Sequence, residues 1–273
     1  MPHELLTALL LGILEGVTEW LPVSSTGHLL LLEGVLSPPW RSAFSQLFLV
    51  AIQLGAMGAV PVLFWRRLCP VGRGKTGDER KRILLLWCKV LIATLPAALV
   101  GFFLDDRLER ALYHPPVVAG ALIVYGVVFI LLEKRRKRIP FVGIAEDISA
   151  KTAFLIGAFQ TLSLVPGTSR SGATVVGGLS LGVSRSAAAE FSFFLGVPTM
   201  LGAGLLKGIK FFTQGNTLSG NEVLLLGLGC GTAFLVSLAA IRFLMELVRR
   251  HSFVGFGIYR ILLGSAVLAL WIF

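Results

Sequence analysis

Long apolar runs separated by short polar segments extend along the whole chain. Six of these runs carry at most one charge and reach ~18 residues or more, the length that a helix needs to cross a hydrocarbon core of ~30 Å. They cover residues 44–64, 83–104, 115–132, 187–206, 223–241 and 253–273. Two further apolar stretches, residues 5–14 and 154–165, are about half as long and lead into polar segments that contain Pro22 and Pro166. The pattern predicts an all-α integral membrane protein with six transmembrane helices and two re-entrant helical hairpins, which enter the membrane and turn back.

The composition agrees with a membrane protein and excludes a soluble globular one. Hydrophobic residues make up 55% of the 273 residues and charged residues only 15%, with a mean hydropathy of +0.82. So few charges cannot cover a water-facing surface. The three cysteines, Cys69, Cys88 and Cys230, lie far apart and show no spacing typical of a disulfide framework or a metal site.

The basic residues predict the orientation in the membrane. A net charge of +10 could indicate a nucleic acid partner, but Lys and Arg in membrane proteins gather in cytoplasmic loops, so we expect no nucleic acid. Basic clusters occur at residues 66–82, after the first span, and at 134–138, after the third. Two spans separate these clusters, so both lie on one side, which the positive-inside rule makes cytoplasmic. If both hairpins turn back, the two termini face outward.

The order of the elements suggests that the chain repeats itself once. Residues 1–140 hold a hairpin over about 4–36 and three spans, and residues 150–273 hold a hairpin over about 151–183 and three spans. Because three crossings are an odd number, the second half is inserted upside down relative to the first. We expect a single membrane domain in which the two Pro-containing breaks are enclosed by protein and meet near the midplane.

Two acidic residues precede the first break. Glu15 and Glu19 are four positions apart and share a helix face, so two carboxylates point at one spot in an apolar environment. Two unpaired buried anions are very costly, and they share a proton, meet a cation, or both. A divalent cation would neutralise them and bridge a phosphate, which makes both residues candidate metal ligands. The alternative is that one glutamate is a water-exposed interfacial residue.

Three hydroxyl residues follow Pro22. We expect Ser24, Ser25 and Thr26 at the N-terminus of the next short helix, where free backbone amides and the helix dipole favour an anion. Ordinary helix capping would account for one of the three. His28, three positions after Ser25, supplies a base or a nucleophile, unless it is a hydrogen-bonded packing residue.

The second break supplies a positive charge. Arg170 has no carboxylate nearby in the sequence, so a phosphate is its expected partner. The neighbouring residues that we expect to help bind phosphate are Ser169, Ser171, Gly172 and Thr174. One break with acids and a histidine and another with an arginine indicate a single site, which requires Arg170 to lie close to Glu19.

Three further charges lie within the predicted spans. For Glu190 and Arg260 we expect a structural ion pair, at one or both residues, that supports the hairpins. Lys89 is expected to extend its long side chain to the cytoplasmic surface.

The two breaks carry long motifs. Glu15-Gly-Val-Thr-Glu-Trp-Leu-Pro-Val-Ser-Ser-Thr-Gly-His28 and Pro166-Gly-Thr-Ser-Arg-Ser-Gly-Ala-Thr174 resemble the two signature motifs of the undecaprenyl-diphosphate phosphatase family, also called bacitracin resistance proteins. The resemblance implies a hydrolase of the bacterial cytoplasmic membrane, with a site that we expect to open outward. Its expected substrate is undecaprenyl diphosphate, which loses its terminal phosphate and becomes the lipid carrier reused in cell-wall synthesis. The resemblance also implies a divalent cation such as Mg2+ or Ca2+.

Phosphoryl-transfer chemistry gives each residue a hypothetical role. Arg170 and the hydroxyls and amides beside it grip the phosphates, while Glu15 and Glu19 hold the metal or one of them acts as general base. Ser25 is the leading nucleophile, with His28 either activating it or being phosphorylated itself. Direct attack by water stays open at this point.

A transporter is the alternative, because inverted repeats with broken helices are also a transporter design. In that case the protein would carry a lipid phosphate or a small anion, and the glutamates would bind protons or sodium. We expect the partners to be a polyprenyl diphosphate lipid substrate and membrane lipids, with a homodimer as a candidate assembly.

Overall fold

The computed structural model describes residues 2–36, 38, 40–72, 74–135 and 141–272. Their secondary structure is helical, apart from one isolated bridge between Val142 and Val183, so the all-α prediction is confirmed. The second basic cluster falls only partly in this range, because Arg136, Lys137 and Arg138 lie outside the described residues, as does the start of the linker at 139–140.

Within the described part of the chain, six helical segments are long and apolar enough to cross a membrane, one for each predicted span. They are α3 with α4 (Ser42–Met57 and Ala59–Leu63), α6 (Gly77–Leu112), α7 (Pro115–Arg135), α10 (Arg185–Thr213), α11 (Gly220–Arg250) and α12 (Val254–Ile272). The shorter elements are α1 (Pro2–Thr18), α2 (Ser25–Leu36), α5 (Trp65–Leu68), η1 (Ala145–Asp147), α8 (Ala150–Gln160), η2 (Thr161–Leu164) and α9 (Arg170–Ser180). The predicted multi-pass membrane protein is therefore confirmed.

Several helices extend beyond their apolar runs because polar residues stabilise the ends. At the start of α11, Ser219 and Glu222 form a capping box, in which each side chain accepts a hydrogen bond from the other residue's backbone N–H. At the end of α11, Arg249 and Arg250 lie in the last turn, where positive charge interacts favourably with the helix dipole. The apolar run thus marks the membrane-embedded part of a longer helix.

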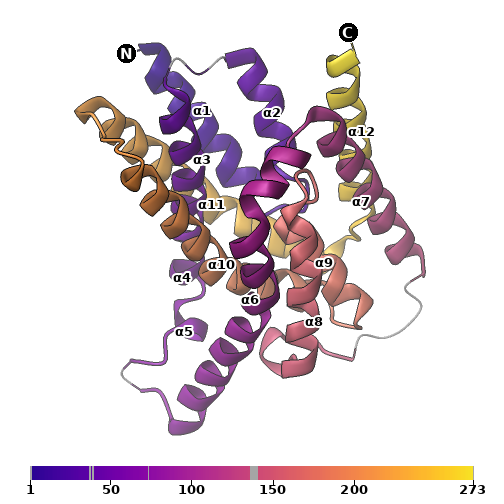
Figure 1. The fold of residues 1–273 in the computed structure, drawn as a ribbon. Coiled ribbons are helices and arrows are strands. Elements are labelled where there is room, and N and C mark those ends of the chain that lie inside the picture. The colour runs from indigo at the N-terminus through magenta and orange to yellow at the C-terminus, as the bar shows by residue number, and fades with distance from the viewer. Residues whose placement is uncertain (1, 37, 39, 73, 136–140, 273) are drawn as a thin grey trace.

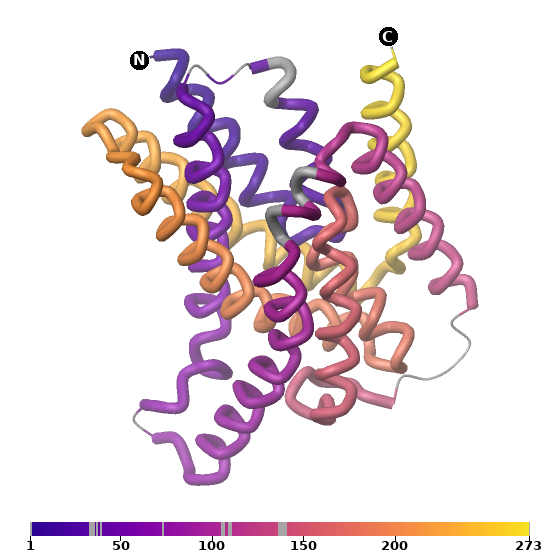
Figure 2. The backbone as a smooth tube through the Cα atoms, in the orientation of Figure 1, coloured from indigo at the N-terminus to yellow at the C-terminus, as the bar shows by residue number. Residues whose placement is uncertain are grey.

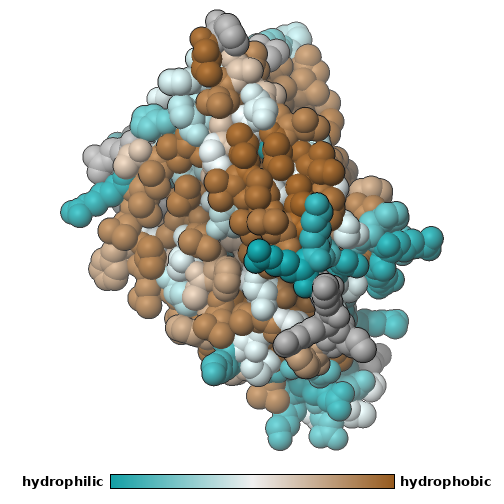
Figure 3. All heavy atoms as spheres, turned by 90° about the vertical axis from the view of Figure 1, so that its right-hand side faces the viewer, coloured by the Kyte–Doolittle hydropathy of each residue, from teal (hydrophilic) through white to brown (hydrophobic). Residues whose placement is uncertain are grey.

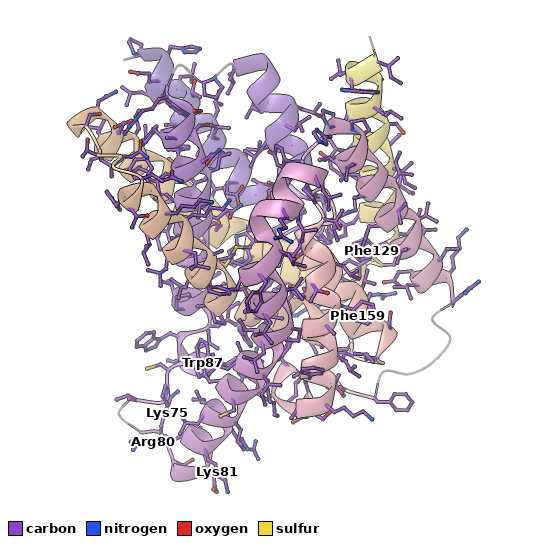
Figure 4. The ribbon with its side chains drawn as sticks, viewed as in Figure 1. Lys75, Arg80, Lys81, Trp87, Phe129 and Phe159 are labelled. Carbon is purple, nitrogen blue, oxygen red and sulfur yellow. The ribbon has the colours of Figure 1, made fainter. Side chains whose placement is uncertain are left out.

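Both chain termini lie at one end of the helix bundle (Figure 1). Lys75, Arg80 and Lys81 lie at the opposite end (Figure 4). The helices pack in pairs that are distant in sequence, with α1 on α11, α6 on α8, and α7 on α12. Figure 2 shows α7 and α12 running side by side. The shorter helices pack in consecutive pairs, α1 with α2 and α8 with α9.

The outer surface of the bundle is apolar. Leu91, Leu95 and Leu99 form one stripe along α6 at a spacing of four residues, and each is more than half exposed. On the face shown in Figure 3, hydrophobic side chains cover much of the upper and middle surface, and hydrophilic side chains gather at mid-height on the right and toward the lower end. An exposed apolar surface of this extent is typical of contact with lipid.

Small residues allow α1 to approach α11 closely. A Cβ atom added at Gly12 would lie 2.7 Å from the carbonyl oxygen of Gly229, and one added at Gly16 would lie 2.7 Å from that of Ala233. Larger residues at these two positions would push the helices apart. This close contact anchors the helix that carries Glu15 against a membrane-spanning helix.

An ion-pair network joins α5, η1 and α10. Arg67 contacts Glu146 at 2.6 Å and Glu190 at 2.9 Å, so the predicted ion pair of Glu190 is confirmed. Lys89 donates a hydrogen bond to the backbone carbonyl of Glu146 at 2.7 Å. Burial raises the pKa of Glu146, but the hydrogen bonds from Arg67, a backbone hydrogen bond and the charges of Arg67 and Lys89 together outweigh this effect and hold the pKa below its ordinary value. The network fixes three segments that are far apart in sequence.

Candidate active site

The chain breaks its helical path twice, at the positions that the two motifs predict. The first break (Glu19–Ser24) lies between α1 and α2, and the second break, which includes η2, extends from Thr161 to Ser169 between α8 and α9. Each contains a proline, Pro22 or Pro166, which lacks a backbone N–H. The predicted helix starts are confirmed.

Both breaks end on a serine with the same unusual backbone conformation. Ser24 and Ser169 each have φ = 72°, in the left-handed region that non-glycine residues rarely adopt. The Ser24 hydroxyl accepts a hydrogen bond from the Gly27 amide at 3.4 Å, and the Ser169 hydroxyl accepts one from the Gly172 amide at 3.1 Å. The N-cap that forms repays part of the cost of this conformation. Capping therefore accounts for Ser24 and Ser169.

The two breaks meet through Glu19 and Arg170. The Oε1 atom of Glu19 accepts hydrogen bonds from the Nε and Nη2 atoms of Arg170 at 3.2 and 3.1 Å. Both side chains are about 5% exposed. Arg170 also donates from Nη1 to the carbonyl of Ser192 in α10 at 2.7 Å. The proximity that a single site requires is present, and Glu19 is a carboxylate partner that the sequence surroundings of Arg170 did not reveal.

Ser25 lies on the other oxygen of the same carboxylate. Its hydroxyl donates to the Oε2 atom of Glu19 at 3.3 Å, and the side chain is buried. Glu19 thus binds Arg170 with one oxygen and Ser25 with the other. A carboxylate held in this way is placed to accept the Ser25 proton, which is the geometry of a nucleophile beside a base.

The two hydroxyl residues at the start of α9, just after the second break, have protein partners. Ser171 donates to the backbone carbonyl of Glu19 at 3.2 Å, and its hydroxyl lies 3.1 Å from that of Ser169. Thr174 donates to the Ser192 hydroxyl at 2.7 Å, so it attaches α9 to α10. Ser171 therefore connects the two breaks, whereas Thr174 faces a neighbouring helix.

Glu15 is fully buried next to this cluster. Neither of its carboxylate oxygens accepts a hydrogen bond from the described residues. Its carboxyl group lies within electrostatic range of Glu19 and of Arg170. The described residues contain no group of three or more His, Cys, Asp or Glu side chains around a common point. Two glutamates are thus the acidic ligands that the chain can offer a cation here, and the exposed interfacial position considered for one of them does not occur.

His28 turns away from Ser25. Its Nδ1 atom lies 2.7 Å from the backbone carbonyl of Ser24, and its Nε2 atom lies 2.7 Å from the hydroxyl of Tyr259, whose ring stacks on it. A carbonyl can only accept, so Nδ1 carries the proton, and in a neutral ring Nε2 accepts from Tyr259. Both ring nitrogens are therefore occupied without contacting the Ser25 hydroxyl.

Arg260 of α12 lies fully buried against both breaks. It donates to the carbonyl of Pro22 at 3.1 Å and to the carbonyls of Gly167 and Thr168 at 2.8 and 2.9 Å. Arg260 pairs with no carboxylate of the described residues, so of the two residues for which an ion pair was predicted, at one or both, Glu190 forms it. Carbonyls in non-helical segments lack helical partners and need donors, and Arg260 supplies them. The expectation that this residue supports the two breaks is confirmed.

A cavity of about 530 Å³ lies beside Thr26, the residue after Ser25, and its lining does not include Glu19, Ser25 or Arg170. Its lining combines apolar side chains, such as Leu29 and Trp40, with polar ones, such as Gln46 and Gln53. A mixed lining of this kind suits an amphipathic ligand.

Comparison with known protein families matches residues 8–266 to the family described as bacitracin resistance protein BacA. The chain belongs to the BacA family. Several relatives of this BacA-family chain carry the name undecaprenyl-diphosphatase. One from Streptococcus thermophilus is 52% identical, covering 97% of the chain and 92% of the relative. One from Enterococcus faecalis is 46% identical, covering 97% of each, and one from Acetivibrio thermocellus is 49% identical, covering 97% and 96%.

Proposed function

We propose that the protein is an undecaprenyl-diphosphate phosphatase, an integral membrane hydrolase that converts undecaprenyl diphosphate to undecaprenyl phosphate and inorganic phosphate. One observation carries the proposal: Ser25, Glu19 and Arg170 form a single buried cluster in which a nucleophile, a base and a cation are in contact. The names of relatives about half identical over nearly the whole chain support the same activity. The reaction returns the carrier lipid to cell-wall synthesis.

The first chemical step begins at the Ser25 hydroxyl. Its oxygen attacks the terminal phosphorus and forms an O–P bond while the bond to the bridging oxygen breaks, and undecaprenyl phosphate leaves with that oxygen. The Ser25 proton passes to Glu19, which lies 3.3 Å away. Water then attacks the phosphoserine, releases inorganic phosphate and restores the hydroxyl.

Arg170 stabilises the charge that develops on the phosphoryl oxygens. Its guanidinium is held at fixed orientation by Glu19 and by the carbonyl of Ser192, so little reorganisation is needed when the phosphate enters. The first-turn amides of α2 and α9, at Thr26 and Ser171, lie at helix N-termini that favour an anion. We therefore keep Ser24, Thr26, Ser169, Ser171 and Gly172 in the phosphate-binding set, and give Thr174 the role of attaching α9 to α10.

Glu15 and Glu19 fit a divalent cation such as Mg2+ or Ca2+. The two buried oxygens of Glu15 have no hydrogen-bond donor among the described residues, which is a costly arrangement for a carboxylate without a cation or a proton. Two carboxylates leave coordination positions for water and for phosphate oxygens, as is common for Mg2+. When bound, the cation supplies charge neutralisation at the diphosphate.

His28 receives a positioning role instead of a general-base role. Its bonds to the Ser24 carbonyl and to Tyr259 hold the first turn of α2 against α12. Glu19 takes the role of base because it is the group in contact with Ser25.

The substrate class follows from the cavity at Thr26. We assign this cavity to the phosphate that stays on the lipid and to the first isoprene units. Gln46 and Gln53 would lie near that phosphate, and Trp40 and Leu29 near the isoprene units. The rest of the polyprenyl tail stays in the hydrocarbon beside the apolar outer surface.

We interpret residues 1–140 and 150–273 as inverted repeats, each with a re-entrant hairpin and three spans. The equal φ values of Ser24 and Ser169, the N-caps that they form and the pairing of α1 with α2 and of α8 with α9 support this interpretation. Lys75, Arg80 and Lys81 of the first basic cluster lie at the end opposite the termini, which supports cytoplasmic basic loops, outward termini and a site that opens toward the outer side.

The decisive experiment measures phosphate release. Purified protein in detergent is incubated with a polyprenyl diphosphate and Mg2+, beside the Ser25→Ala variant. We expect release by the wild type and a loss of ~100-fold or more in the variant. No release by well-folded wild-type protein would contradict the proposal. No observation in the site favours the anion carrier considered as the alternative.

A further inference from the structure

Besides the bond from the Ser171 hydroxyl to the Glu19 carbonyl, two bridges connect the breaks, and they differ in kind. The first consists of side chains, Glu19 and Arg170, which are the groups that contact the substrate in the proposed reaction. The second consists of one residue, Arg260, which binds backbone carbonyls of both breaks at 2.8 to 3.1 Å. Arg260 comes from α12, a helix outside both breaks.

The carbonyls that Arg260 binds lie next to the reacting groups in sequence. Pro22 is three residues after Glu19 and three before Ser25, and Thr168 is two residues before Arg170. Moving either carbonyl moves the backbone that carries these side chains. The position of one guanidinium therefore sets the distance between the acidic and the cationic halves of the site.

The surroundings of Arg260 fit a positioning role. Its side chain is fully buried without a carboxylate partner in the described part of the chain, and its guanidinium lies over the ring of Tyr125. A buried cation is expensive and is not needed for packing alone. A Cβ atom at Gly172 would lie 3.3 Å from Nη1, so the guanidinium fits closely against the first turn of α9. The planar fork reaches three carbonyls at once, which a lysine ammonium on a flexible chain cannot reproduce.

We propose that Arg260 is a positioning residue for the phosphatase reaction, which holds Ser25 and Glu19 of the first break at the working distance from Arg170 of the second. The adjacent Tyr259 contributes to the same positioning, because its hydrogen bond to His28 attaches the start of α2 to α12. The kinetic consequences of this inference rest on the proposed function. The contacts of Arg260 with the backbone carbonyls of both breaks, called the Arg260 clamp below, can be tested without any reaction.

The first test uses kinetics of Arg260→Met and Arg260→Lys, normalised to folded protein. Because a displacement of ~1 Å in a reacting group can cost ~100-fold in rate, we expect Arg260→Met to lower kcat by about 100-fold and Arg260→Lys by about 10-fold, with KM changed less than about 3-fold. Arg185→Met is the matched control: Arg185 pairs with Glu133 of α7, which also accepts from the Phe253 amide, but it touches neither break. We expect the control to keep its kcat even if its Tm falls.

A double-mutant cycle with Arg170→Lys separates positioning from simple stability. If Arg260 acts by placing Arg170 against Ser25, its removal costs less than about 10-fold when Arg170 is already replaced. If replacing Arg260 only reduced the amount of folded protein, activity would fall by the same factor with Arg170 present and with Arg170→Lys. Equal losses in the two backgrounds, or a kcat per folded enzyme within about 3-fold of wild type, would overturn the proposal.

Hydrogen exchange provides the readout that needs no substrate. We expect Arg260→Met, or Arg260→Lys if the methionine variant does not fold, to increase amide exchange in both break peptides, residues 19–28 and 161–172, relative to Arg185→Met. Unchanged protection in either peptide would also overturn the proposal. If the wild type releases no phosphate while both peptides respond, the proposed function fails and the Arg260 clamp stands.

Discussion

At the scale of single residues, the site depends on one carboxylate whose two oxygens bind different partners. Glu19 accepts two bonds from Arg170 on Oε1 and one from Ser25 on Oε2. The cation lowers the cost of burying the carboxylate, and the free lone pairs of Oε2 keep it able to accept a proton. Each of the three residues thus determines the state of the other two.

Glu19→Gln separates the role of the base from that of the scaffold. The amide oxygen can still accept from Arg170, but the side chain no longer accepts a proton from Ser25. We expect kcat to fall by ~100-fold or more, while KM for a polyprenyl diphosphate changes far less. Arg170→Ala, measured in the same assay, should also raise KM, because it removes a phosphate-binding group. A Glu19→Gln enzyme with near-normal kcat would exclude Glu19 as the base.

Glu15→Gln tests the cation proposal. The amide is neutral and of similar size, so it removes a charged ligand with little change in packing. We expect the Mg2+ concentration for half-maximal activity to rise by ~10-fold or more, and direct binding of Mn2+ to the variant to weaken in parallel. Unchanged metal dependence and unchanged Mn2+ binding would show that Glu15 is simply protonated in the buried cluster.

At the scale of the elements, local signals in the sequence were sufficient to place the helices and their breaks. Apolar run length fixed the six spans, and Pro22 and Pro166 followed by hydroxyl residues marked the starts of α2 and α9. The proximity of Glu19 to Arg170 was predicted because one acidic and one cationic break indicated a single site. Their direct ion pair was not predicted, because the expected partner of Arg170 was a phosphate.

The contacts made by α12 could not be predicted in the same way. Arg260 binds the carbonyl of Pro22 over 238 positions, and Tyr259 binds His28 over 231 positions. Every residue type has a backbone carbonyl, so the sequence cannot show which carbonyls accept from Arg260. The sequence therefore indicated an acidic partner for Arg260. For the same reason His28 was assigned to the Ser25 hydroxyl, three positions before it in the sequence.

The ion-pair network that joins α5, η1 and α10 gives a pH-dependent stability. Because the pKa of Glu146 is lower in the folded protein, its contribution is complete above the unfolded value of about 4.3 and is lost as the pH falls through the folded value. We expect Glu146→Gln to lower Tm at pH 7 and to make a smaller difference near pH ~3.5.

The control for this measurement is Asp147→Asn, one residue along, since Asp147 makes no ion pair within the described residues. It should leave the pH dependence of Tm unchanged. A Glu146→Gln effect that grows as the pH falls would contradict the direction of the shift.

At the scale of the whole molecule, the distribution of charge and the position of the site lead to one orientation. Lys75, Arg80 and Lys81 lie at the end opposite the termini, and α1 and α2 connect the terminal end to the first break. If basic loops stay in the cytoplasm, the cavity at Thr26 receives a lipid whose diphosphate faces the outer side of the membrane. The enzyme would then act on the carrier lipid where cell-wall assembly releases it.

Cysteine labelling of intact cells tests this orientation. With Cys69, Cys88 and Cys230 replaced, His3→Cys and Lys81→Cys each introduce one exposed thiol at opposite ends of the bundle. A membrane-impermeant maleimide should modify position 3 in intact cells and position 81 only after permeabilisation, because moving the basic 66–82 segment across the membrane would oppose the positive-inside bias. Phosphate release in the cysteine-free background checks that the fold is kept. Modification of position 81 from outside, with position 3 protected, would reverse the orientation and place the site on the cytoplasmic side, where a lipid diphosphate released on the outer surface could reach it only after crossing the bilayer.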